Sequence, residues 1–116
     1  MPHAVVLGAR RLPEIPEGPL LRRDGVIHKV VETARGRSGL ILKSLVVDHG
    51  RSVRFLARID ERPDGLVVRL DDHMEVERTP EVFDHLAELA RLVLAANPGS
   101  ALGPTNLADR IASLAP

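Results

Sequence analysis

Hydrophobic and polar positions in the middle of the chain follow the pattern of sheet strands. Leu40–Val47 is apolar on both faces apart from Lys43 and Ser44, which predicts a central strand. Residues 53–60 then alternate apolar and polar or charged positions, as a half-buried strand does, and residues 66–70 return as a third strand. Turn-forming residues at 48–51 and 61–65 separate these strands. We therefore expect an antiparallel meander over residues 40–76.

Towards the C-terminus the apolar period changes to that of a helix. Residues 80–96 carry a wide apolar stripe, preceded by Thr79 as N-cap and Pro80 at the first helical position. The opposite face of this predicted helix, which we expect to meet solvent, carries the polar side chains Glu81, His85 and Glu88. Residues 99–104 read as a loop, and Thr105 reads as the cap of a short last helix.

The N-terminal third is harder to assign. Residues 4–7 predict a short strand, and residues 9–23 hold three prolines and a glycine, which predict an extended, irregular segment. Residues 24–36 allow two interpretations. Apolar residues recur at 26, 27, 30, 31 and 34, which favours a helix with His28 on its surface. The alternative is a hairpin between residues 20–23 and 26–31, with Asp24-Gly25 as its turn.

These elements predict one α+β domain over residues 1–116. We expect a mostly antiparallel sheet of four to five strands, formed by the 40–76 meander and flanking strands. Its apolar face packs on the helix at 80–96, and further helices flank it. The length of 116 residues, with 44% hydrophobic and 28% charged positions, is that of a single globular domain.

Composition narrows the chemistry and the compartment. The chain has no cysteine, which excludes disulfides, thiolate zinc sites and cysteine nucleophiles. It has no apolar run of membrane-spanning length and no signal-peptide pattern at the N-terminus, so we expect a cytoplasmic protein. Arginine dominates the basic residues, glutamine is absent and proline occurs nine times, a composition that suits a heat-adapted protein.

The net charge of zero conceals a gradient along the sequence. Residues 1–58 carry a formal charge of +6 and residues 59–116 carry −6. The basic half supplies candidate contacts to a nucleic-acid backbone: Arg35, Arg37, Arg51 and Arg54. Aromatic side chains that stack on bases are scarce, because Phe55 and Phe83 are the only aromatics and both fall on core positions. Nucleic acid is therefore a disfavoured partner.

Two acidic turns form the candidate metal site. Asp48 and His49 follow the first strand of the meander, and the third strand leads into Asp71, Asp72 and His73. The first and third strands of a meander run in the same direction, so we expect these turns at one edge of the sheet. Carboxylates and imidazoles that converge there could bind a divalent cation. Both residue types are also common in turns for local reasons.

Neither a catalytic motif nor a phosphate-binding loop is recognisable, and no cofactor is predicted. The sequence favours a non-catalytic interaction or scaffold module, a homodimer or the partner of another protein, because the strand Leu40–Val47 needs cover on both faces. The alternatives are a binder of nucleic-acid backbones through the arginines and a metal-dependent enzyme at the Asp48/Asp71 edge.

Overall fold

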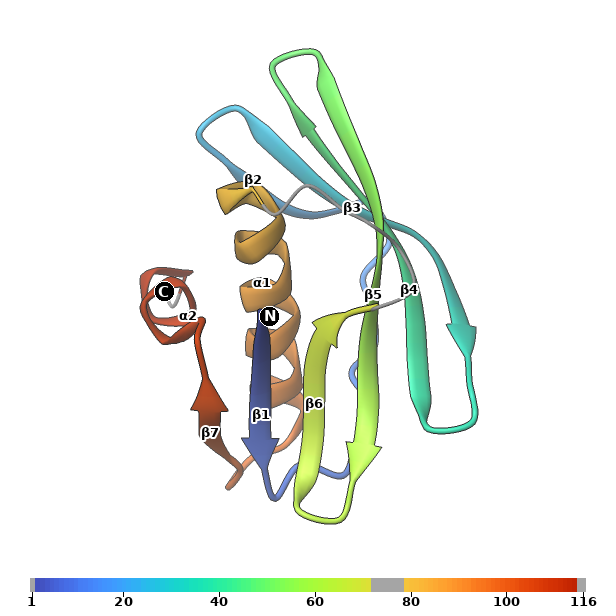
Figure 1. Ribbon diagram of the computed structural model, residues 1–116, viewed down its shortest axis with the longest axis vertical. Helices are drawn as coiled ribbons and strands as arrows, with labels where there is room; N and C mark the ends of the chain where they lie inside the picture. Colours follow the sequence, from blue (N-terminus) through green and yellow to red (C-terminus); the bar gives the residue numbers. More distant parts are fainter. Residues whose placement is uncertain (1, 72–78, 115–116) are drawn as a thin grey trace.

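The computed structural model describes residues 2–71 and 79–114, which form one curled sheet with two helices (Figure 1). The strand order in the sheet is β2-β3-β4-β5-β6-β1-β7, and every neighbouring pair is antiparallel. The strands are β1 His3–Leu7, β2 Pro19–Arg23, β3 Val26–Arg35, β4 Gly39–Asp48, β5 Arg51–Arg62, β6 Gly65–Leu70 and β7 Ala101–Thr105. The helices are α1 Pro80–Ala96 and α2 Ala108–Leu114.

The sheet is larger than the sequence predicted. Strands account for 50% of the chain and helices for 23%, and the seven strands curl into a half-barrel. The prediction of a four- to five-stranded α+β sheet was therefore wrong. The meander itself is present as β4, β5 and β6, whereas residues 72–76 of its predicted range lie outside the described residues.

The helix expected over residues 24–36 is a strand, and the hairpin alternative is correct. Asp24 and Gly25 have φ values of 51° and 78°, the left-handed geometry of a two-residue hairpin turn. β2 therefore lies within the segment that was predicted to be irregular. The apolar spacing fitted a helix, but Val26 and His28 also alternate with exposed or half-exposed neighbours as strand residues do. The β-branched residues of this segment favour that second pattern.

The predicted loop at 99–104 holds the other missed strand, β7. It pairs with β1 and forms one end of the sheet, a position that tolerates Pro104 because one side of an edge strand needs no amide donors. Thr105 then joins the sheet to the last helix. Its hydroxyl donates a hydrogen bond to the His3 carbonyl at 2.7 Å and accepts one from the Leu107 amide at 2.9 Å.

The first helix confirms the predicted boundaries but not the predicted solvent face. The Thr79 hydroxyl accepts a hydrogen bond from the Val82 amide, as an N-cap does. However, His85 and Glu88 are only 0% and 4% exposed, although both were expected to face solvent. The reason is that the sheet itself covers His85, through β3, β4 and β5, and that α2 also packs on α1.

We call the face of the sheet that packs on α1 the inner face. The hydrophobic core lies between this face and the helix. Residues 2–71 and 79–114 contain no helix that is long and apolar enough to span a membrane.

Candidate functional site

Asp48 and Asp71, which belong to the two turns of the predicted metal site, lie at different levels of the sheet. β4 and β6 run in the same direction, as predicted, but Asp48 pairs with Arg51 whereas Leu70 pairs with Ala57. Six residues of β5 separate those two levels, which corresponds to roughly 20 Å along the strand. The unequal lengths of β5 and β6 cause this offset, so the structure does not bring Asp48 and Asp71 together.

Asp48 and Asp71 instead contact different neighbours. Asp48 and His49 are hydrogen-bonded to each other, and the Asp71 carboxylate lies 3.6 Å from the Arg58 guanidinium. Asp72 and His73 lie outside the described residues. Within residues 2–71 and 79–114, no group of three or more histidine, aspartate or glutamate side chains is placed to hold a metal ion.

The four candidate arginines do not form one patch. Arg35 and Arg37 lie at the β3–β4 turn, whereas Arg51 and Arg54 lie near the start of β5, at the opposite end of β4. Ten residues of β4 separate these ends, a span of roughly 30 Å. Ion pairs also join the basic N-terminal half to the acidic C-terminal half, such as Arg35–Glu61 at 3.4 Å. These pairs partly neutralise the charge gradient along the sequence.

Sequence reasoning missed a cluster of buried polar side chains between α1 and the sheet. His85 Nε2 lies 2.9 Å from the Ser44 hydroxyl, and the His85 ring stacks on His28 with 5.5 Å between ring centroids. The Phe55 ring meets His85 edge-on at 4.9 Å. His28, Ser44 and His85 are all 3% exposed or less. α1, β3, β4 and β5 each contribute one side chain to this cluster.

The hydrogen bonds assign the roles within the cluster. The Ser44 hydroxyl donates to the Leu42 carbonyl at 3.4 Å and can then accept from His85 Nε2–H. The buried Nδ1 atoms of His28 and His85 have no hydrogen-bond partner among the described residues. Because burial disfavours the charged imidazolium and His28 adds like-charge repulsion, the pKa of His85 falls to about 3. Burial also lowers the pKa of His28, against the opposing pull of Asp84, Glu81 and Glu88.

A serine hydroxyl hydrogen-bonded to an imidazole has the composition of a nucleophile–base pair. Here α1 closes over both groups, so a substrate in solution does not reach them. We therefore assign the cluster to the packing of α1 on the sheet. The sequence signal that could have found it is the alternation Val26, His28 and Val30 in one strand, which places the histidine on the apolar face.

The buried Glu88 also has a structural partner. Its two carboxylate oxygens accept hydrogen bonds from Arg91 Nε and Nη2 at 2.9 and 2.7 Å, and this contact raises the pKa of Arg91. The bidentate geometry satisfies a carboxylate that would otherwise be costly to bury.

The most distinctive accessible feature is the edge of β3 on the side away from β4. β2 pairs with this side only as far as Lys29, and no other strand in the described parts of the chain pairs with residues 30–35 there. All five residues from Val31 to Arg35 are exposed. Val31 is 53% exposed and is the bulged residue between the Val30–Ser44 and Glu32–Lys43 pairs. We call Val31–Arg35 the free edge.

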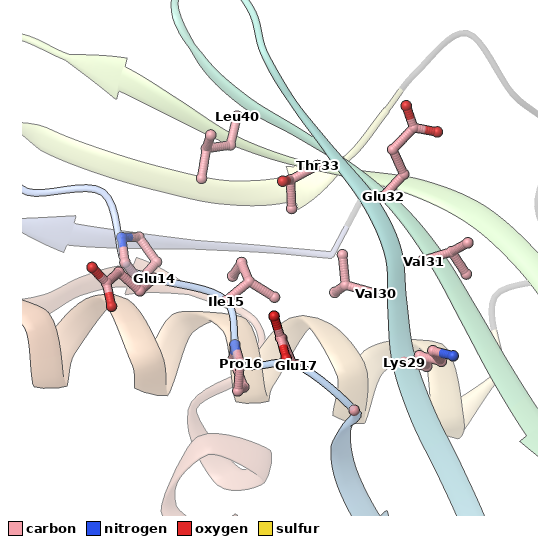
Figure 2. A pocket seen from close by; sticks show the side chains of 12 residues that line it. Glu14, Ile15, Pro16, Glu17, Lys29, Val30, Val31, Glu32, Thr33 and Leu40 are labelled. Carbon is pink, nitrogen blue, oxygen red and sulfur yellow. The ribbon is translucent and has the colours of Figure 1, made fainter.

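A groove lies beside the start of the free edge (Figure 2). It has a volume of about 630 Å³ and is lined by residues 13–18, by residues 29–33 of β3 and by Leu40. Figure 2 shows the side chains of Ile15 and Val30 facing each other across it, whereas Lys29 and Val31 project from the other side of β3. Exposed Glu14 and Glu17 lie on the wall opposite β3.

In comparisons with known proteins, no protein-family model, curated protein or solved structure matches the chain.

Proposed function

We propose that this protein is a non-catalytic interaction module that self-associates by adding a strand to the free edge of β3. The observation that carries the proposal is the free edge itself, an exposed run of five strand residues at which pairing with β2 has already ended. A strand edge of this kind offers a row of backbone donors and acceptors to a second chain.

The outer strands at the two ends of the sheet differ from the free edge in a way that supports this choice. The outer strands β2 and β7 each contain a proline, Pro19 and Pro104, which removes an amide donor. The free edge contains no proline, and it carries the most exposed large hydrophobic side chain of the described residues, Val31. It is therefore better suited to accept another strand than the outer edge of β2 or of β7.

The polar features of the free edge favour a selective partner over indiscriminate aggregation. Bulges and charged side chains are devices that protect edge strands from unwanted pairing. The bulge at Val31 adds local twist, and Glu32 and Arg35 place opposite charges along five residues. A strand that pairs here must match both the twist and the charges.

The proposal predicts a dimer that lysines on the free edge disrupt. The native chain should show a mass of twice 12.6 kDa by light scattering at concentrations on the order of 100 µM, where modest interfaces are populated. The double variant Val31→Lys with Thr33→Lys should remain a folded monomer, because lysines on both copies repel across a paired edge.

The matched control is Leu7→Lys. Leu7 is the other exposed large hydrophobic residue of the described chain, at 38%, but its strand β1 is paired on both sides. This variant should dimerise like the native chain. A native chain that stays monomeric over the whole concentration range, or a Leu7→Lys change that abolishes a dimer which the edge variant retains, would overturn the proposal.

A further inference from the structure

Resting on the proposed function, we infer that the partner strand is the free edge of a second copy, antiparallel about a two-fold axis at Thr33. In this arrangement the basic β3–β4 turn of each copy lies against the acidic groove wall of the other. The inference rests on acidic side chains at one end of the free edge and basic side chains at its other end.

The acidic end is the groove wall before the free edge begins. Glu14 and Glu17 are exposed there, and neither forms an ion pair within residues 2–71 and 79–114. The basic end is the β3–β4 turn, where Arg37 is exposed and likewise has no ion-pair partner in the described ranges. Arg35 lies beside it, with 67% of its side chain exposed even though it contacts Glu61.

A surface with opposite charges at its two ends is complementary to itself only when the two copies run antiparallel. A parallel arrangement would place acid on acid and base on base, and like charges across an interface disfavour it. A two-fold axis makes the same patch serve both copies and closes the assembly at a dimer. Charge therefore selects both the orientation and the stoichiometry.

The length of the free edge fixes the register. An axis at Thr33 pairs Thr33 with its own copy and Glu32 with Ala34, and it places the bulged Val31 of one copy beside Arg35 of the other. Shifting the axis to Glu32 would set that carboxylate against itself. Because this two-fold axis is perpendicular to the sheet, the inner faces of the two copies lie on the same side of the combined sheet. Arg35 of one copy, which shares the inner face with Thr33, then approaches the groove side that holds Glu14 and Glu17.

Charge reversal on the two ends tests this arrangement. The acid-end variant is Glu14→Arg with Glu17→Arg, and the base-end variant is Arg35→Glu with Arg37→Glu. Measured alone by sedimentation equilibrium, each should dimerise about tenfold more weakly than the native chain, since each would then present like charges at both contacts. An equimolar mixture should form a heterodimer of near-native affinity, because both contacts then join acid to base.

A matched control reverses charges outside the interface, with Arg62→Glu and Asp64→Arg in the β5–β6 turn; these residues pair with each other at 3.1 Å. This variant should dimerise normally. If the native chain dimerises but charge reversal has no effect, or the mixture fails to recover affinity, the two-fold arrangement is wrong while edge pairing stands. If Val31→Lys with Thr33→Lys leaves the dimer intact, the proposed function fails as well.

Discussion

Acidification from pH 7 to pH 4.5 is expected to lower the free energy of unfolding by about 2–3 kcal/mol through His85 alone. The folded pKa of His85 is about 3, against an ordinary value of 6.5. Below pH 6.5 the unfolded chain therefore binds a proton that the folded chain does not. Stability is retained above pH 6.5 and is lost progressively as pH falls towards 3. Urea titrations at several pH values measure this slope.

A non-titrating replacement isolates the contribution of the buried histidine. His85→Gln keeps an amide that can donate to Ser44 but cannot take up a proton in this range, so the acid-induced loss should shrink by about 2–3 kcal/mol. Equal acid sensitivity in His85→Gln and the native chain would show that the cluster does not couple to folding.

Truncating the core face of α1 should have an effect of similar size at neutral pH. Leu86 and Leu89 are both 0% exposed and belong to the core between helix and sheet. Leu86→Ala or Leu89→Ala removes buried methyl groups and leaves a cavity, at a cost of about 2–5 kcal/mol. Denaturant titration monitored by circular dichroism gives the difference in unfolding free energy.

Leu92→Ala on the same helix is the control for this measurement. Leu92 is only partly buried, so its truncation removes fewer contacts and should cost clearly less. If Leu92→Ala were as damaging as Leu86→Ala, the packing of α1 on the sheet would be oriented differently from the structure described above.

Local sequence patterns correctly predicted those elements for which several independent signals agree. The 40–70 meander has alternation, apolar runs and turn residues that all indicate strands, and α1 has its cap, its proline and its period. Residues 24–35 show conflicting signals, because the apolar spacing suits a helix and the β-branched residues and Asp24-Gly25 turn suit a hairpin. The pairing of β3 with β4 decides in favour of the strand, and the spacing of apolar residues within 24–35 does not reveal that pairing.

The site could be predicted less well than the fold, because it depends on the register in which neighbouring strands pair. Nothing local reveals that β2 stops pairing at Lys29, although the free edge exists only for that reason. Likewise, the helical pattern of α1 predicted a solvent face for His85, which is closed by β3, β4 and β5 together. Asp48 and Asp71 lie apart because β5 is twice as long as β6, with 12 residues against six.

The most direct test of the self-association proposed for β3 is amide hydrogen exchange as a function of protein concentration. Raising the concentration from about 5 to about 200 µM populates a weak dimer. The amides of Val31–Arg35 that face away from β4 should then exchange more slowly, because they donate to the second strand. The amides of β7, at the far end of the sheet, should not change. Exchange at the free edge that is independent of concentration, or slowing confined to β7, would contradict the account.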